Sequence, residues 1–264
     1  MHEDLTVDID GRGVATITLN RVDKHNALSS ELIANLHAAA RRLGDDKAVR
    51  VVVLTGAGPS FCAGGDLGWM RAQMAADGPA RAAEARKLAG MLGALNTMPK
   101  PLIGRVQGQA FGGGIGLISV CDVAVSVNTA RFALTETRLG LIPATIGPYV
   151  CARLGEAAAR RVFLSGRRFD AQEAVALGLL ARAVPEAELD AATEAEVAPF
   201  LACAPRAVAR AKALLRRLGP AIDERVVEDS VAALVACWED EEAQEGIAAF
   251  FDRRKPSWVP SAER

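Results

Sequence analysis

Two glycine-rich loops, each placed directly after an apolar run, constrain the fold of this 264-residue chain most strongly. The first loop covers residues 56–66 and follows the β-branched run at residues 49–55. The second covers residues 109–116 and follows the apolar run at residues 102–106. Such runs are typical of strands buried on both faces of a parallel sheet. We therefore expect each loop to bring a backbone N–H group to a common point.

The second loop contains three consecutive glycines, Gly112, Gly113 and Gly114, at the start of a helix-like run. Without a Cβ, backbone can approach a ligand closely and can adopt positive φ. The first N–H groups of a helix lack intrahelical acceptors and suit a negatively charged oxygen. The plainer interpretation of an isolated glycine triplet is a tight strand-to-helix turn packed against neighbouring backbone. The triplet alone does not decide between the two.

Strands alternate with helices in the first part of the chain, and residues 186–251 then look helical, with breaks at Pro199, Pro205 and the pair Gly219-Pro220. A break is also expected at Gly78 and Pro79. The order predicts an α/β fold with a core at residues 1–200 and a helical region at residues 201–264.

Composition narrows the function classes. Lys and Arg number 31 against 32 Asp and Glu, which leaves no electrostatic case for nucleic-acid or membrane binding. No apolar run approaches the ~18 residues of a membrane span. The five cysteines form no Cys-x-x-Cys pair and residues 1–10 show no secretory leader, so a reduced, cytoplasmic compartment is expected. The three histidines form no metal-binding motif, so no metal is expected.

Several other chemistries are disfavoured. Neither loop fits Gly-x-Gly-x-x-Gly, and the chain contains no phosphate-binding Gly-x-x-x-x-Gly-Lys-Ser/Thr and no Gly-x-Ser-x-Gly elbow. Two loop amides that meet would instead form an oxyanion hole for an enolate or a tetrahedral oxyanion. Loss of one such donor costs ~2.7–4 kcal/mol in a known case.

The motifs, taken in order, resemble the enoyl-CoA hydratase/isomerase (crotonase) superfamily. The similarity rests on Phe61-Cys-Ala-Gly-Gly-Asp-Leu67, Ala110-Phe-Gly-Gly-Gly114, Cys121-Asp122, Glu136 and Leu139-Gly-Leu-Ile-Pro143, with further matches at residues 20–28, 165–170, 174–180 and 246–255. The chain is most similar in look to bacterial methylglutaconyl-CoA hydratase-like and carboxygeranoyl-CoA hydratase-like members.

The resemblance implies a ClpP-like spiral of ββα units with a C-terminal helical trimerisation region, and homotrimers that often pair into hexamers. It implies an acyl-CoA thioester as substrate. Coenzyme A is then part of the substrate, and no separate cofactor is expected.

The resemblance also assigns site residues. The amides of Ala63 and Gly113 would hold the thioester oxygen, with Gly112 beside them. The coenzyme A moiety would be bordered by two segments: Lys24, His25 and Ala27 in one, and Ala63, Gly64, Gly65, Asp66 and Leu67 in the other. Phe250 and Arg253 would reach a bound coenzyme A from a neighbouring subunit. A solvated basic helix end is an equal alternative for residues 253–255.

Glu136 matches the second of two glutamates in the hydratases of this family, and Gly116 stands where the first is expected. A glutamate beside an apolar acyl pocket has a raised pKa, as acid/base work at neutral pH requires. A single base suffices to isomerise a 3-enoyl-CoA, whereas hydration also needs a held water. The wider similarity favours hydratases, in which Gly116 would leave room for a branched or carboxylated acyl group.

Three further side chains have two interpretations each. Arg138 would pair with a substrate carboxylate or form an intramolecular salt bridge. Trp69 and Met70 would line the acyl pocket or belong to the core. The sequence thus predicts reversible hydration of a 2-enoyl-CoA, with a Δ3,Δ2-enoyl-CoA isomerase as the first alternative and a non-catalytic CoA-binding scaffold as the second.

Overall fold

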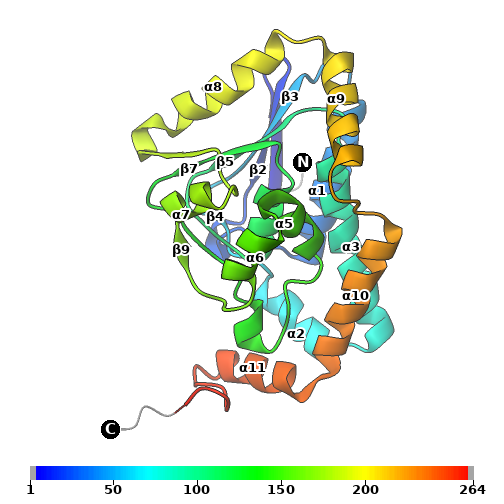
Figure 1. The fold of residues 1–264 in the computed structure, drawn as a ribbon, viewed down its shortest axis with the longest axis vertical. Helices are drawn as coiled ribbons and strands as arrows, with labels where there is room; N and C mark the ends of the chain where they lie inside the picture. Colours follow the sequence, from blue (N-terminus) through cyan, green and yellow to red (C-terminus); the bar gives the residue numbers. More distant parts are fainter. Residues whose placement is uncertain (1–3, 261–264) are drawn as a thin grey trace.

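A six-stranded sheet forms the centre of the molecule in the computed structural model, which describes residues 4–260 (Figure 1). Its strand order is β1-β2-β3-β5-β7-β10. These strands are β1 (Leu5–Ile9), β2 (Val14–Leu19), β3 (Val51–Gly56), β5 (Leu102–Val106), β7 (Val123–Val127) and β10 (Arg182–Val184). β1 pairs antiparallel with β2, and every other neighbouring pair is parallel. The α/β class and the buried strands near residues 49–55 and 102–106 are confirmed.

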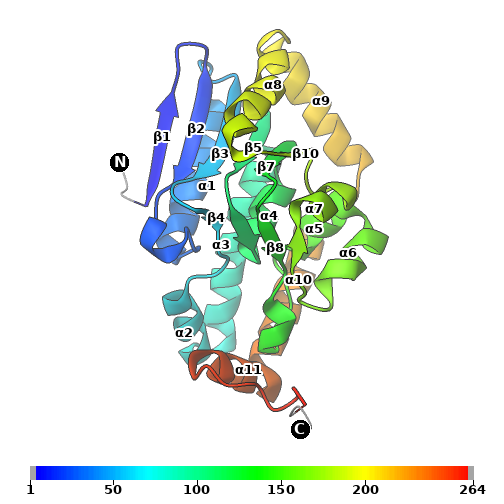
Figure 2. The same ribbon diagram turned by 90° about the vertical axis from the view of Figure 1, so that its left-hand side faces the viewer.

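Helices cover both faces of this sheet. Successive side chains of a strand point to opposite faces, and in β3 both sets are buried. Val52 and Leu54 pack in the main core with α1 (Ser30–Asp45) and α3 (Gly78–Thr97). Val51 and Val53 pack with Val197 of α8 (Leu189–Leu201), on the other face (Figure 2).

A second sheet carries the two glycine turns. It has the order β4-β6-β8-β9 and consists of β4 (Ser60–Cys62), β6 (Gln109–Phe111), β8 (Arg131–Ala133) and β9 (Phe169–Asp170). β4 and β6 pair in parallel and end at the two turns. Sequence patterning does not predict these strands, except β8, because segments of two or three residues show no periodicity. Their pairing brings the glycine turns side by side.

Short helices complete the core. They are α2 (Leu67–Ala75), α4 (Gly113–Ser119), α5 (Gly147–Leu154), α6 (Glu156–Phe163) and α7 (Ala171–Ala176), together with the 3₁₀ turns η1 (Val22–Lys24), η2 (Glu136–Leu139) and η3 (Glu186–Glu188).

The break expected at Gly78 and Pro79 exists but lies two residues earlier. α2 ends at Ala75, and the Asp77 side chain accepts from the Ala80 amide and caps α3, so Gly78 and Pro79 are the first residues of this helix. The break expected at Pro199 is wrong, because this residue lies inside the last turn of α8, which continues to Leu201.

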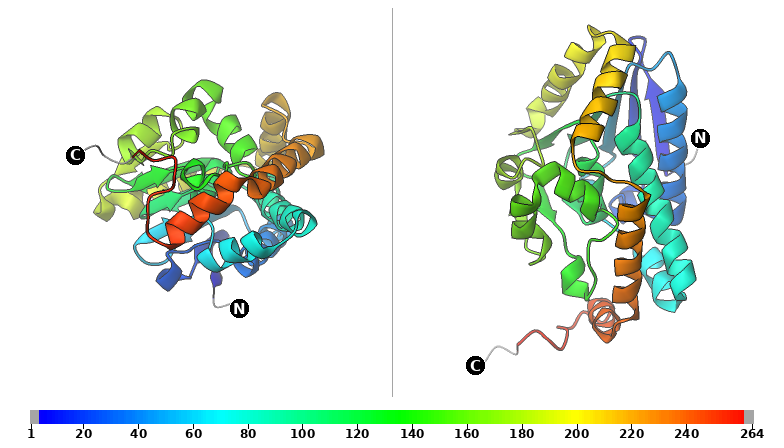
Figure 3. Two further views of the ribbon diagram at one scale, coloured as in Figure 1. Left: turned by 90° about the horizontal axis from the view of Figure 1, so that it is seen from below. Right: turned by 45° about the vertical axis from the view of Figure 1, so that its right-hand side comes forward.

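The C-terminal helices α9 (Pro205–Leu218), α10 (Glu224–Glu239) and α11 (Glu241–Phe251) wrap the core. α10 runs beside α3, and α11 crosses the end of the molecule beneath η2 (Figure 3). This approach is close: a Cβ on Gly246 would stand 2.5 Å from the carbonyl carbon of Leu139. An apolar cluster that includes Met70, Leu141 and Trp238 joins α2, the segment after η2 and α10. Within residues 4–260, no helix is both long and apolar enough to cross a bilayer.

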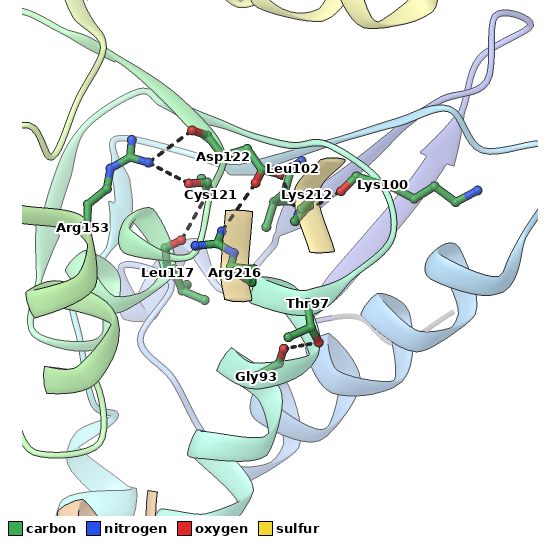
Figure 4. A network of polar contacts seen from close by, with 10 residues as sticks. All are labelled: Gly93, Thr97, Lys100, Leu102, Leu117, Cys121, Asp122, Arg153, Lys212 and Arg216. Atoms are coloured by element: carbon green, nitrogen blue, oxygen red, sulfur yellow. Dashed lines mark hydrogen bonds and ion pairs between the residues drawn. The ribbon is translucent and has the colours of Figure 1, made fainter. Parts of the chain in front are cut away.

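A buried ion pair fixes α9 to the core (Figure 4). Lys212 is only 8% exposed, and its Nζ lies 2.6 Å from Asp122 Oδ2 and 2.9 Å from the Lys100 carbonyl oxygen. The same Asp122 oxygen accepts from the Leu102 amide at the start of β5. The Arg153 guanidinium of α5 donates to the carbonyls of residues 121 and 122. The Asp122 side chain thus links the start of β5 to α9.

Candidate active site

A largely apolar cavity of about 480 Å³ lies where the glycine turns, η2 and the C-terminal helices meet. Its wall combines the two turns with apolar side chains of α2, α3, α10 and α11. The residues that line it include Leu28, Ala63, Gly64, Gly65, Leu67, Trp69, Met70, Phe111, Gly112, Gly113, Glu136, Arg138, Thr145, Ile146, Arg168, Trp238 and Phe250. Trp69 lines the cavity, and Met70 both lines it and packs in the apolar cluster.

The first glycine turn is held by backbone bonds to residues 25–28. The Ala63 amide donates to the His25 carbonyl at 3.0 Å, so its hydrogen is already used. The expectation that Ala63 supplies a free amide is therefore wrong. The Leu28 amide donates to the Gly64 carbonyl at 2.7 Å. In a trans peptide the N–H points opposite to the C=O, so the Gly65 N–H points away from Leu28 and donates to no acceptor within residues 4–260.

The second glycine turn lies against the first. A Cβ on Gly64 would stand 3.7 Å from the Gly113 nitrogen, and one on Gly113 would stand 2.7 Å from Leu28 Cδ1. The Gly113 amide opens α4 and has no acceptor among the described residues. Gly112 has a φ of +47°, which favours glycine. Free amides of both turns, those of Gly65 and Gly113, thus belong to residues on one cavity wall.

Glu136 is the one carboxylate among the lining residues. A Cβ on Gly112 would stand 2.8 Å from Glu136 Oε1, so only a glycine at position 112 leaves room for this carboxylate. Its Oε2 is buried and has no hydrogen-bond partner in the described part of the chain. Burial raises the pKa of Glu136 to about 7, although its own backbone N–H counteracts part of the rise. A carboxyl with this pKa can both accept and release a proton near neutral pH.

Gly116 is covered by a neighbouring side chain. It is buried, it is absent from the cavity wall, and a Cβ there would stand 2.5 Å from Ile146 Cγ2. The expectation that Gly116 contacts the substrate and leaves room for a branched acyl group is therefore wrong. Ile146 itself forms that part of the wall.

Arginines contribute positive charge to the wall. The Arg138 side chain packs against Gly166, and the Arg168 guanidinium lies 5.7 Å from the centre of the Phe111 ring. Neither arginine has a carboxylate partner within residues 4–260, so the intramolecular salt bridge considered for Arg138 is not formed there.

The residues expected to border coenzyme A fall into two groups. Gly64, Gly65 and Leu67 line the cavity, whereas Lys24, His25 and Ala27 lie behind the first turn and do not. The His25 Nδ1 is hydrogen-bonded to Ser60 Oγ at 2.9 Å.

Asp66 is also away from the cavity, because its carboxylate caps α2 and pairs with Arg21 at 3.0 Å. Burial raises the pKa of Asp66, but amide hydrogen bonds and Arg21 outweigh this and hold it below its ordinary value.

Of the two C-terminal residues expected to contact coenzyme A, Phe250 lines the cavity and Arg253 does not. Phe250 of α11 lines the cavity of its own chain, and its expected contact with coenzyme A from a neighbouring subunit stays a prediction. Arg253 has a φ of +56°, is exposed and does not line this cavity.

Comparison with known proteins identifies the family of the chain. The sequence profile of the family described as enoyl-CoA hydratase/isomerase matches residues 10–260. The chain belongs to this family. Enoyl-CoA hydratase AKT6-1 of Alternaria alternata is 34% identical over 246 residues, which cover 92% of this chain and 80% of that protein.

Solved structures of the enoyl-CoA hydratase/isomerase family have the same fold. An enoyl-CoA hydratase from Mycobacterium avium matches with a TM-score of 0.85 and 34% identity, over 98% of this chain and 100% of that one. One from Shewanella pealeana ATCC 700345 matches with a TM-score of 0.79 and 38% identity, over 97% and 96%. The chain is thus an enzyme of the crotonase fold, and its relatives indicate a hydro-lyase that acts on acyl-CoA.

Sequence reasoning missed Gly65 as the residue with the free amide, and it missed Arg168, Thr145 and Ile146 on the wall. Only the Gly65 amide had a signal, since it lies in the glycine-rich turn. The other three are ordinary residue types whose position depends on the packing of α5 and β9.

Proposed function

We propose that this hydro-lyase adds water reversibly to the C2=C3 bond of a 2-enoyl-CoA, with Glu136 as the acid/base residue. The observation that carries the proposal is the buried Glu136 carboxylate, with one unpartnered oxygen, on the wall that also presents two free amides. Perturbed pKa values are concentrated at functional sites. A carboxylate whose burial raises its pKa to about 7 therefore favours a catalytic protein over a non-catalytic scaffold.

The amides of Gly65 and Gly113 bind the thioester oxygen in this mechanism. When water attacks C3, the π electrons move toward C2 and the carbonyl, and negative charge develops on that oxygen. Donors fixed by backbone bonds stabilise this charge without reorganisation. Gly64 supports the arrangement, because its φ of +95° and its close approach to Phe111 exclude a side chain there.

Glu136 transfers one proton in each direction. Its carboxylate accepts a proton from water as the oxygen bonds to C3, and the resulting carboxylic acid donates a proton to C2. The net change is the addition of H and OH across the double bond. The reverse sequence eliminates water.

The acyl group of the proposed substrate is branched or carboxylated. A carboxylated acyl group is supported by Arg138 and Arg168. Both residues line the cavity, and neither guanidinium group has a carboxylate partner within residues 4–260. A carboxylate at the end of an acyl chain gains charge-assisted hydrogen bonds from such groups. A single glutamate also suits a Δ3,Δ2-isomerase, which remains the second candidate.

The decisive experiment follows the loss of the conjugated absorbance of a 2-enoyl-CoA and, separately, its gain from a 3-enoyl-CoA. Hydration of the first is expected in the wild type and is expected to fall ~10²–10⁴-fold in Glu136→Gln. Glu156→Gln, in an exposed pair with Arg160, is the matched control. Turnover of the 3-enoyl substrate alone would identify an isomerase, and CoA-thioester binding without any turnover would identify a scaffold.

The carboxylate assignment is tested by comparing a carboxylated with an uncharged 2-enoyl-CoA of equal length. Arg138→Gln combined with Arg168→Gln should raise KM for the carboxylated substrate and leave KM for the uncharged one unchanged. An equal effect on both substrates would contradict the assignment.

The enzyme is further proposed to form homotrimers or hexamers through α9. Leu214, Leu215 and Leu218 are 47%, 69% and 74% exposed, whereas Lys212 is the one buried residue of this helix. Exposed apolar side chains of this kind on a helix fixed to the core suit a second copy of the chain.

A further inference from the structure

Within residues 4–260, three buried side-chain polar atoms have no hydrogen-bond partner: Asn35 Nδ2, Glu136 Oε2 and Thr145 Oγ1. Glu136 and Thr145 line the same cavity, whereas Asn35 on α1 does not. Thr145 is only 4% exposed. A buried polar atom left unpartnered costs ~1–3 kcal/mol, so its presence calls for a physical reason.

Thr145 lies in residues 140–146, which connect η2, the 3₁₀ turn that begins at Glu136, to α5. Thr145 directly precedes Ile146, the residue that covers Gly116. Ile146 therefore closes the place of a second carboxylate, and Thr145, the residue before it, lines the same cavity as Glu136.

We propose that Thr145 and Glu136 together hold the water that attacks C3, an inference that rests on the hydratase function proposed above. The water donates one O–H to Glu136 Oε2 and the other to Thr145 Oγ1. A lone pair of the water oxygen is then free to face C3. Glu136 takes the first proton as the C–O bond forms, and the O–H that faces Thr145 stays intact as the product hydroxyl.

This arrangement satisfies what a buried water requires. Ordered waters make about 2–4 hydrogen bonds to polar groups that otherwise lack a partner. The carboxylate of Glu136 and the hydroxyl of Thr145 both accept hydrogen bonds. Thr145 takes no proton, so it is a water-positioning residue and Glu136 remains the only acid/base group.

The test compares Thr145→Val, which replaces the hydroxyl with a methyl of similar size, with Thr145→Ser, which keeps it. Hydration of a 2-enoyl-CoA and hydrogen–deuterium exchange at C2 of a saturated acyl-CoA in deuterium oxide are both measured. Exchange needs Glu136 to remove and return a proton at C2, but it needs no water at C3. Thr145→Val should lower kcat for hydration on the order of 10- to 100-fold, with KM and the exchange rate unchanged, and Thr145→Ser should restore most of kcat.

Two results would overturn the inference. If Thr145→Val hydrates as fast as the wild type, the hydroxyl holds no water. If it loses exchange and hydration together while circular dichroism shows a native fold, Thr145 acts on Glu136 or on acyl binding. Glu136→Gln separates this inference from the proposed function: retained hydration in that variant refutes the function, whereas lost hydration beside a fully active Thr145→Val refutes only the role of Thr145.

Discussion

The Ile146 side chain occupies the space beside Gly116, so that a Cβ on Gly116 would stand 2.5 Å from Ile146 Cγ2 and 3.0 Å from Ile146 Cβ. The two residues come from α4 and from the end of the loop before α5, which pack together. Glycine at position 116 is thus explained by helix packing and not by space for a substrate.

This contact predicts a non-additive pair of substitutions. Gly116→Ala alone should destabilise the protein by ~1–3 kcal/mol through overpacking. Ile146→Ala alone should cost ~2–5 kcal/mol through the cavity it leaves. The double variant should be more stable than the sum of the two costs implies, because the new methyl enters the vacated space. Urea unfolding of all four proteins measures the coupling, and strictly additive costs would contradict the contact.

The activity should depend on the protonation of Glu136. Burial raises the pKa of this carboxyl to about 7, and hydration needs the deprotonated form to accept the water proton. We expect kcat/KM for hydration to rise with pH and to level off above about 7. A stopped-flow pH profile checks this, and a flat profile from acid to neutral pH would refute Glu136 as the base.

The same carboxyl should lower stability as pH rises. Its folded-state pKa of about 7 exceeds the ordinary 4.5, so the folded protein holds more protons than the unfolded chain between these values. The contribution to stability is therefore fully present below pH 4.5 and is lost as pH rises through 7, a change of roughly 3 kcal/mol. The Glu136→Gln side chain cannot titrate. The free energy of unfolding of this variant, measured with urea, should therefore increase relative to that of the wild type by about this amount between pH 5 and pH 8. An equal difference at both pH values would contradict the burial of this charge.

The Asp122–Lys212 pair should behave as a buried ion pair. Burial lowers the pKa of Lys212 despite the opposing effect of Asp122. Asp122→Ala leaves the ammonium without its carboxylate and the Leu102 amide without an acceptor, so we expect a loss of ~3–5 kcal/mol. Lys212→Met should cost less, because it removes the charge itself. Arg86→Gln, in an exposed pair with Glu228, serves as the control with a cost below ~1 kcal/mol. Thermal and urea unfolding rank the three, and equal losses for Asp122→Ala and Arg86→Gln would refute the pair's structural role.

The exposed leucines of α9 should control the oligomeric state. Light scattering of the wild type is expected to give a trimer or a hexamer. Leu215→Glu with Leu218→Glu should shift the protein toward the monomer, because two charges then face the apolar contact. Leu164→Glu, at an exposed leucine outside α9, is the matched control. An unchanged mass for the α9 variant would contradict self-association through this helix.

The sequence by itself determined the fold class and singled out Glu136 as the proposed base. Continuous β-branched runs predict the buried parallel strands, and the ordered glycine motifs together with Glu136 predict the family, because these features are local in the chain. Helix caps are local as well: the Ser29 side chain at the start of α1 and the Asp170 side chain at the start of α7 each accept from an amide three residues further along.

Only the tertiary structure decided which groups are available to the substrate. The Ala63 amide is occupied by the His25 carbonyl, so the free donor is at Gly65. Ile146 fills the space at Gly116, and Thr145 and Phe250 reach the cavity from distant parts of the chain. The physical reason is that the direction of a peptide N–H and the neighbours of a residue type depend on contacts between segments far apart in sequence, and no local pattern encodes those contacts.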